Sequence, residues 1–223
     1  MTDGSRRRRG RASGGAGRPG RTGRPPLTER RKAATRLEIA REAVRLFTSQ
    51  GVAGTSAEEI AAAAGISVRT LWRYFPSKEG CVRPLLAAGI EAVARSLRAW
   101  PPGRGVDALL HDVEQAGGVA VADVPTMLAL VRLTRTEPGL RAVWLQAHDD
   151  AEPIFAAALG HRAGLPADAP RVRVQAAVIN GALRAAVEHY AWHAVPAQPP
   201  EAGGDGLIEE IRTALVTAAR GLD

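Results

Sequence analysis

Hydrophobic residues recur at helical spacing over most of the chain that follows residue 27. The first helix is expected at 28–50 and should end at Gly51, because glycine readily adopts the left-handed conformation that closes many helices. Its buried face, with residues three or four positions apart, should consist of Leu37, Ala40, Val44 and Phe47, widened by Ile39, Ala43 and Leu46.

Two short helices are expected next. Thr55 and Ser56 each precede a glutamate by three residues, the capping-box pattern for a helix start, and this helix should stop near Gly65. Ser67 can cap a second short helix that runs through Phe75, after which a proline breaks it.

Six further helices fit the hydrophobic spacing, with glycine- and proline-rich breaks between them. They are expected at 77–99, 105–117, 122–136, 139–160, 169–193 and 206–221. Alanine is abundant and runs of β-branched residues are scarce, so the predicted fold class is all-α. The chain divides into an arm (1–27), a three-helix head (28–78) and a larger helical body (79–223).

The net charge of +7 is concentrated at the beginning of the chain. The arm alone carries +7, whereas the head carries +4 and the body −4. Because the arm has almost no apolar side chains to offset the entropy of ordering, we predict that it is disordered. A basic front on an acidic body favours a polyanion such as DNA as a partner. The arm can add to DNA affinity or remain a solvated tail.

Several functional classes find no support in the sequence. Cys81 is the single cysteine, which excludes an intrachain disulfide. No apolar run reaches the roughly 18–20 residues of a membrane span, and no signal-peptide core follows the first charges. We therefore predict a cytoplasmic protein. Gly15, Gly17 and Gly20 match a nucleotide-binding pattern but lack the strand and helix that it needs. No catalytic motif is found, so we predict no enzyme activity, no cofactor and no metal.

The two short helices, separated by a turn that contains glycine and preceded by an amphipathic helix, predict a helix-turn-helix head. In such a head the second short helix exposes polar side chains to the major groove of DNA, and apolar side chains hold it at a fixed angle. The inward side should consist of Ile60, Ala64, Ile66 and Leu71. The mostly outward side should consist of Val68, Arg69, Thr70, Trp72, Arg73 and Tyr74.

Residues 65–79 read GISVRTLWRYFPSKE, and the approach to them runs from Ala40 through Phe47, Gly51 and Thr55 to Ile60 and Ala61. This pattern resembles the signature of the tetracycline-repressor (TetR) family of bacterial transcriptional regulators. The resemblance covers about residues 33–80, and it is specific because the spacing, the turn, the two aromatic residues and the Pro-Ser-Lys segment all agree.

The resemblance implies which residues bind DNA: Thr55, Ser56, Ser67, Val68, Arg69, Thr70, Trp72, Arg73, Tyr74 and Lys78. Arg69 could pair with a guanine edge, and Val68 and Thr70 with a thymine methyl group. Tyr74, Lys78, and either Thr55 or Ser56, match positions that grip phosphates; Arg73 fits a backbone contact and solvent equally. Many family members carry tyrosine at the position of Trp72, so the operator sequence does not follow from relatives.

The body is expected to sense a ligand. The segments 127–132, 137–142, 161–164 and 185–192 resemble the subgroup whose C-terminal domains bind acyl-CoA-like molecules. The candidate pocket residues are Met127, Leu128, Val131, Arg132, Trp144, Phe155, Ile179, Leu183 and Tyr190, with ordinary core packing as the alternative for each. Arg132 and Arg135 could meet an anionic head group or face solvent.

The helices at about 169–193 and 206–221 are expected to form a homodimer, as a four-helix bundle with their symmetry mates. Small residues in the first of them permit close approach: Ala176, Ala177, Gly181, Ala182, Ala185 and Ala186. The second offers Leu207, Ile208, Ile211, Leu215 and Ala218. Packing within one chain is the alternative.

The predicted function is a repressor that binds operator DNA and is released by a small hydrophobic or acyl-CoA-like effector. An activator or architectural DNA-binding protein without small-molecule control is the alternative. His189 and His193 have a spacing that could serve metal binding, and Cys81 could serve redox sensing. Pro84 is expected to kink the helix at 77–99 and so to tune how the body moves the head.

Overall fold

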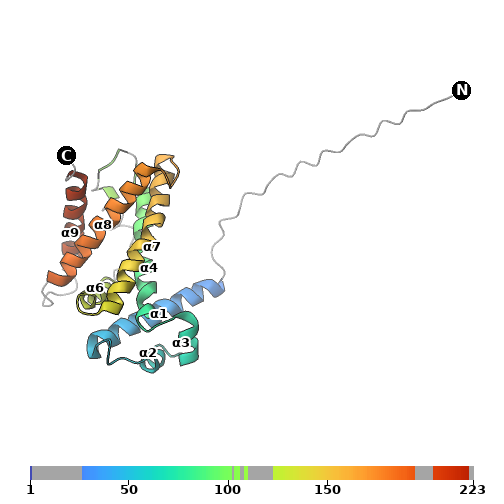
Figure 1. Ribbon diagram of the computed structural model, residues 1–223, viewed down its shortest axis with the longest axis vertical. Helices are drawn as coiled ribbons and strands as arrows, with labels where there is room; N and C mark the ends of the chain where they lie inside the picture. Colours follow the sequence, from blue (N-terminus) through green and yellow to red (C-terminus); the bar gives the residue numbers. More distant parts are fainter. Residues whose placement is uncertain (2–26, 102, 106–107, 110–122, 194–202, 221–223) are drawn as a thin grey trace.

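The structure, a computed structural model, describes residues 1, 27–101, 103–105, 108–109, 123–193 and 203–220. The regular elements in these ranges are all helices, which confirms the predicted all-α class (Figure 1). They are α1 (Leu27–Gln50), α2 (Ala57–Ala63), α3 (Val68–Tyr74), the 3-10 helix η1 (Glu79–Val82), α4 (Arg83–Ala99), α6 (Val124–Leu133), α7 (Pro138–Ala163), α8 (Pro170–His193) and α9 (Gly203–Arg220).

The helices form a head and a body. Helices α1, α2 and α3 make the head at the lower end of the molecule, and α4, α7, α8 and α9 form the upright body (Figure 1). Along the body α4 packs on α7, α7 on α8, and α8 on α9. The short helix α6 lies at the lower end of the body and contacts both α8 and α1. The head is therefore held by α4, α6 and η1.

The predicted helices agree with the observed ones over the described ranges. The helix expected at 105–117 falls almost wholly outside the described residues, as does the arm at 2–26. In α1, the predicted face is buried as expected, with Ile39, Ala40, Ala43 and Phe47 each 0% exposed.

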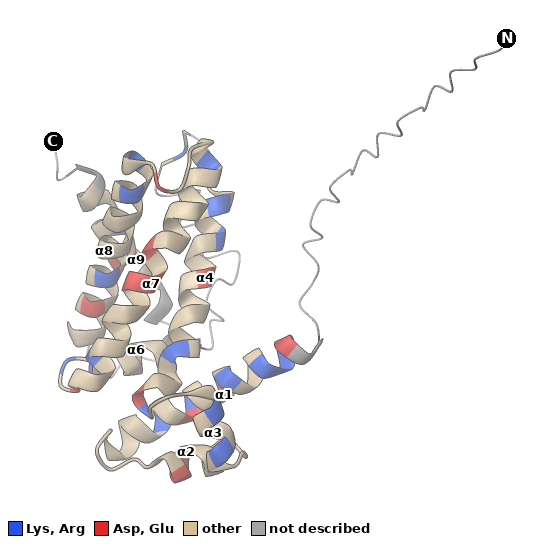
Figure 2. Ribbon diagram, turned by 45° about the vertical axis from the view of Figure 1, so that its right-hand side comes forward, with Lys and Arg blue, Asp and Glu red and all other residues tan. Residues whose placement is uncertain are grey.

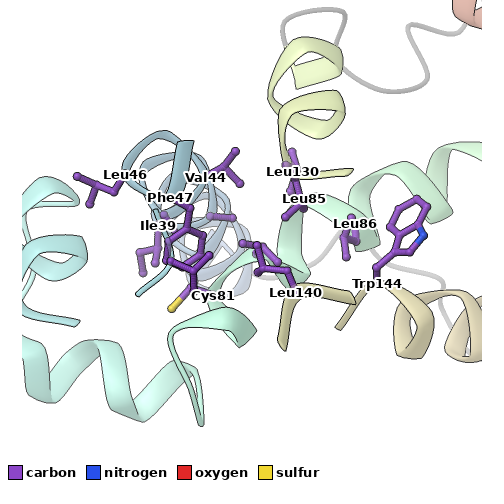
Figure 3. Packing of buried hydrophobic residues seen from close by; sticks show 14 of the residues in the cluster. Ile39, Val44, Leu46, Phe47, Cys81, Leu85, Leu86, Leu130, Leu140 and Trp144 are labelled. Atoms are coloured by element: carbon purple, nitrogen blue, oxygen red, sulfur yellow. The ribbon is translucent and has the colours of Figure 1, made fainter. Parts of the chain in front are cut away.

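The buried face of α1 belongs to a hydrophobic cluster that continues from the head into the body. Phe47 and Cys81 lie beside Leu85 of α4 and Leu140 of α7, and the cluster extends to Trp144 (Figure 3). A second cluster fills the upper body around Phe155 and Leu97. The first cluster crosses the predicted boundary at residue 78, so head and body share one core.

An ion pair reinforces this joint between head and body. Arg41 of α1 donates through Nε and Nη2 to the two carboxylate oxygens of Asp123, at 2.7 and 2.9 Å. Asp123 immediately precedes α6, and its side chain is only 5% exposed. The hydrogen bonds that Arg41 donates to Asp123 raise the pKa of the guanidinium, which therefore stays charged. A bidentate pair fixes the orientation of two groups as well as their distance.

The first turn of α7 lies against η1. A Cβ atom placed on Gly139 would lie 3.1 Å from the Cγ of Glu79, which is closer than ordinary contact. Leu140, the next residue, is 1% exposed in the shared core. A side chain larger than hydrogen at position 139 would require the Glu79 side chain to shift.

The prediction of a kink at Pro84 is wrong. The expected helix at 77–99 divides into η1 and α4, and Pro84 occupies the first turn of α4. In the first turn a backbone N–H has no helical acceptor, so proline fits there without bending the helix. Pro84 therefore begins a helix instead of bending one.

Within the described ranges, no helix is long and apolar enough to cross a membrane.

The Arg41–Asp123 pair generates a test of the joint. Replacing the buried carboxylate (Asp123→Ala) should lower the free energy of unfolding by about 2 kcal/mol, because Arg41 loses two charge-assisted hydrogen bonds. Urea denaturation followed by circular dichroism measures this change. The control is Glu38→Ala, since exposed Glu38 accepts from the same guanidinium at 3.2 Å; its effect should stay below about 0.5 kcal/mol. Equal effects of the two variants would show that Asp123 is not part of the joint.

Candidate nucleic-acid interface

Helix α2 is set by a complete capping box. The backbone N–H of Glu59 donates to the Ser56 hydroxyl at 3.2 Å, and the backbone N–H of Ser56 donates to the Glu59 carboxylate at 2.8 Å. The hydrogen bond from that N–H lowers the pKa of Glu59. Of the two capping candidates in the sequence, Ser56 is therefore the N-cap.

Either Thr55 or Ser56 was predicted to bind a phosphate, and the structure disfavours Thr55. It is 2% exposed, and its hydroxyl donates to the carbonyl of Gly51 at 2.7 Å. Gly51 itself has φ +78°, so it makes the left-handed turn expected at the end of α1. Thr55 stabilises the turn between α1 and α2, and Ser56 alone remains available beside it.

Lys78 also stabilises the turn between α1 and α2. Its ammonium donates to the carbonyls of Val52 and Thr55 at 2.6 and 2.9 Å. The sequence reasoning assigned Lys78 only to phosphate. In the structure two of its three N–H donors hold the head together, which leaves one for a phosphate.

Helix α3 begins where the sequence predicted. Gly65 has φ +65° and makes the turn after α2, and the hydroxyl of Ser67 accepts from the backbone N–H of Thr70 at 3.2 Å. Leu71 is 0% exposed and Ile60 of α2 is 0% exposed, so these two predicted inward residues anchor the two helices. The angle between α2 and α3 is thereby fixed by core packing.

The opposite side of α3 faces solvent. Arg69 and Arg73 are exposed, and Trp72 is 47% exposed, which is unusual for so large an apolar side chain. Val68 and Thr70 are half-buried. Arg69 forms no hydrogen bond or ion pair with another described residue, so its guanidinium is free to donate. The predicted groove-facing residues thus share one open surface.

Sequence reasoning missed one residue of this surface. Arg36 of α1 places its guanidinium carbon 5.1 Å from the ring centroid of Tyr74, and Arg73 lies over the same ring at 5.3 Å. The only signal in the sequence is that Arg36 has no acidic residue three or four positions away. Lys and Arg gather on the N-terminal part of α1 and on the neighbouring α3 (Figure 2).

The candidate effector residues of the body do not converge on one described hollow. Leu128, Val131 and Trp144 are buried in the core shared with the head, whereas Phe155 is buried in the upper cluster. Half-buried side chains complete the apolar part of the set: Met127, Ile179 and Leu183. Core packing, which was the alternative to a role in the ligand pocket, therefore accounts for the four buried residues.

Polar groups of the same region are engaged with each other. Arg132 donates to the carbonyl of Ala191 near the end of α8 at 3.0 Å. Glu188 accepts from Arg141 and from the indole N–H of Trp144, each at 2.6 Å. Sequence analysis did not single out Glu188, since its partners come from another helix. These contacts tie α8 to α6 and α7.

A hollow of about 500 Å³ opens between α7 and α8 on the outside of the body. It shares no residue with the candidate pocket. At its floor Nδ1 of His148 lies 2.7 Å from the amide oxygen of Asn180, whose amide N–H₂ donates to the carbonyl of His148 at 2.7 Å. Burial lowers the pKa of His148, which favours its neutral form. The polar floor holds the two helices in register.

The structure supports neither of the two alternative sites, which are redox sensing at Cys81 and metal binding at His189 and His193. Cys81 is 0% exposed, and burial, followed by the charge of Glu79, raises the pKa of its thiol to about 12, so the redox prediction is wrong. His189 and His193 lie with ring centroids 4.5 Å apart. Among the described residues no three His, Cys, Asp or Glu side chains group as metal ligands.

Comparisons with known proteins match both parts of the chain. Residues 39–85 match the family described as bacterial regulatory proteins, tetR family, and residues 104–200 match the family described as MftR C-terminal domain. The chain is similar to the HTH-type transcriptional regulator TcmR from Streptomyces glaucescens, with 32% identity over 155 residues, which cover 65% of this chain and 67% of that protein.

Solved structures share the fold. A TetR-family transcriptional regulator from Syntrophomonas wolfei superposes with a TM-score of 0.55 at 17% identity, over 83% of this chain and 96% of that chain. The fatty acid degradation regulator FadR from Bacillus halodurans superposes with a TM-score of 0.53 at 18% identity, over 84% of this chain and 96% of that chain.

The position of Lys78 generates a test that separates its two roles. Lys78→Met should lower the free energy of unfolding by about 1–3 kcal/mol, because two carbonyls lose a charged donor. Lys32→Met is the control, since Lys32 pairs with Glu29 on the exposed side of α1, and it should cost less than about 0.5 kcal/mol. Thermal denaturation measures both. Unchanged stability of Lys78→Met, together with weaker DNA binding, would instead assign Lys78 to phosphate alone.

Proposed function

Because the chain belongs to the TetR family of bacterial transcriptional regulators, we propose that it represses transcription as a homodimer on operator DNA, and that a small effector bound in the body releases it. The observation that carries the proposal is the open face of α3, where Arg69, Trp72 and Arg73 are exposed on a helix anchored by Leu71. The family is one of DNA-binding regulators and not of enzymes.

In this proposal α3 lies in the major groove. Arg69 donates to a guanine edge, Val68 and Thr70 contact thymine methyl groups, and exposed Trp72 packs on the groove wall. The N-terminal ends of α2 and α3, where Ser56 and Ser67 are the caps, face phosphates together with Tyr74, Arg73 and the remaining N–H of Lys78. Base contacts give sequence preference, and phosphate contacts set the register of the head.

The proposed dimer places two such heads in successive major grooves. On α8 an uncharged outward stripe supports this assembly, with members that recur at three- and four-residue intervals: Val174, Ala177, Val178, Gly181 and Ala185. Val174 is 59% exposed, and a Cβ atom on Gly181 would meet nothing within 4 Å. Small side chains let a partner helix approach closely. Of the other small residues, Ala176 and Ala186 are buried within the chain.

The apolar residues of α9 fall into two groups. Some pack within the same chain, and others could contact a partner subunit. Leu207 and Leu215 are 6% and 5% exposed, so they already pack inside the same chain. Half-buried Ile211 also packs against both clusters of its own chain, so Ile208 and Ala218 are the half-buried residues that remain for a partner. The proposed four-helix bundle therefore relies more on α8 than the sequence suggested.

The proposed effector is hydrophobic or acyl-CoA-like. The residue pattern at 127–132 and 137–142, which resembles that of the subgroup that binds such molecules, supports this class. Half-buried Met127, Ile179 and Leu183 offer apolar surface that the core does not fully cover. In this proposal the acyl chain would contact apolar side chains of both α6 and α8, although Met127 packs against the first cluster and Ile179 and Leu183 against the second.

One observation favours the alternative of a DNA-binding protein without small-molecule control. Leu128, Val131, Trp144 and Phe155, four of the nine candidate pocket residues, are at most 5% exposed and already packed. A binding site at these residues would need the core to open. The effector experiment below separates the two functions.

The first test is binding of the chain to a labelled DNA fragment from upstream of its own gene, at fixed salt. We expect specific retardation that oleoyl-CoA relieves, whereas free CoA and free oleate at the same concentrations do not. Arg69→Ala should weaken operator binding by roughly tenfold or more, because one bidentate base contact is worth about 1–3 kcal/mol. Its affinity for unrelated DNA should stay nearly unchanged.

Retardation that ignores every acyl-CoA tested would favour the alternative without small-molecule control. Equal loss by Arg69→Ala on operator and unrelated DNA would remove Arg69 from base recognition. Failure to bind any duplex selected from random sequence would contradict the proposed function itself.

The α8 stripe generates a separate test of the dimer. Gly181→Arg should convert the dimer to a monomer, because the added side chain has room within one chain but blocks close approach of a second α8. Light scattering after gel filtration measures the mass, and circular dichroism checks that the fold is kept. Ala157→Arg adds the same group at an exposed position of α7 and should leave the dimer intact. A dimeric Gly181→Arg protein would exclude α8 from the interface.

A further inference from the structure

The ring of Tyr74 carries a guanidinium from each of two helices. Arg36 comes from α1 and Arg73 from α3, and their Cζ atoms lie 5.1 and 5.3 Å from the ring centroid. The ring is held in place from behind, because Tyr74 packs against the shared core and meets buried Phe75 edge-on, with centroids 6.3 Å apart. Two cations are thus positioned on a rigid support at the side of the head that presents α3.

The two guanidinium groups form no ion pair within the described residues, although the charge of Arg36 contributes, after the hydrogen bond and the charge of Lys32, to the lowered pKa of Glu29. Three of the other cations of α1 form ion pairs at i,i+3 spacing, whereas Arg30 and Arg31, like Arg36, form none with a described residue: the pairs are Lys32 with Glu29, Arg41 with Glu38 and Arg45 with Glu42. Neither Arg36 nor Arg73 forms an ion pair with a described residue, and both are exposed. Two like charges near one ring repel each other, and an anion bound by both would relieve that repulsion.

We propose that Arg36 and Arg73, stacked on Tyr74, form a clamp for one phosphate of the DNA backbone, so that α1 contacts DNA as well as α3. Guanidinium groups bind phosphate through paired N–H donors, and stacking removes part of the entropy cost of ordering them. The clamp reads no base. It fixes the distance of the end of α3 from one strand and so sets the depth at which the recognition helix lies.

This inference rests on the proposed function, and one experiment distinguishes the failure of each. The affinity of the full chain for its operator and for an unrelated duplex of equal length is measured between about 50 and 200 mM salt, a range over which several phosphate contacts change affinity by orders of magnitude. The variants are Arg36→Ala, Arg73→Ala, their double mutant and Arg36→Lys. Arg45→Ala is the matched control, since Arg45 is an exposed arginine of α1 that pairs with Glu42 at 2.8 Å.

We expect Arg36→Ala to weaken binding to both duplexes by the same factor, roughly tenfold near 0.1 M salt, and to lower the slope of log Kd against log salt by about one. Arg36→Lys keeps the charge and should keep the slope, with an intermediate affinity. Because both arginines would hold the same phosphate, the double mutant should lose less than the sum of the two single losses. Arg45→Ala should match the wild type.

Three results would overturn the clamp while the wild type still binds its operator. One is an Arg36→Ala protein with the salt slope of Arg45→Ala. Another is full additivity of the two single losses, which would place the arginines on separate phosphates. The third is a lower denaturation temperature of Arg36→Ala with an unchanged salt slope, which would make the stack purely structural. Absence of binding by the wild type contradicts the proposed function instead.

Discussion

The side chains of Phe47 in α1 and Leu140 in α7 are almost completely buried in the same hydrophobic cluster, although one belongs to the head and the other to the body. Close-packed cores yield little when a neighbouring element moves. The bidentate contact of Arg41 with Asp123 adds direction to this packing, because it fixes the angle between α1 and the start of α6. A rearrangement of α6 or α7 should therefore displace the helices of the head as well. The shared core transmits this movement, so no linker is needed.

Features that depend on a few neighbouring residues could be predicted from the sequence. Apart from the helix expected at 77–99, which divides into η1 and α4, the spacing of apolar residues predicted the described helices to within a few residues of their ends. The serines at positions 56 and 67 and the glycines at 51 and 65 predicted the turns of the head, since capping and left-handed backbone are decided within one turn of chain. Leu71 was correctly placed inside and Arg69 outside because the period of a short helix leaves little choice.

Features that depend on contacts between distant segments could not be predicted in this way. Lys78 binds carbonyls more than twenty residues earlier in the chain, and Asp123 pairs with an arginine of α1. The spacing of hydrophobic and polar residues in the sequence indicates neither contact. Pro84 looked like a kink only because the boundary between η1 and α4 was not visible in the pattern. The effector residues were chosen as apolar and suitably spaced, which describes a packed core equally well.

The close approach of Gly139 to Glu79 leaves little free space between the first turn of α7 and η1. Movement of these two elements towards each other therefore requires the Glu79 side chain to shift. In a two-headed assembly such a contact would resist a change in the spacing of the heads in one sense more than in the other. Even a methyl group at position 139 would require the same shift of Glu79, at a position outside both the proposed DNA-binding surface and the candidate pocket.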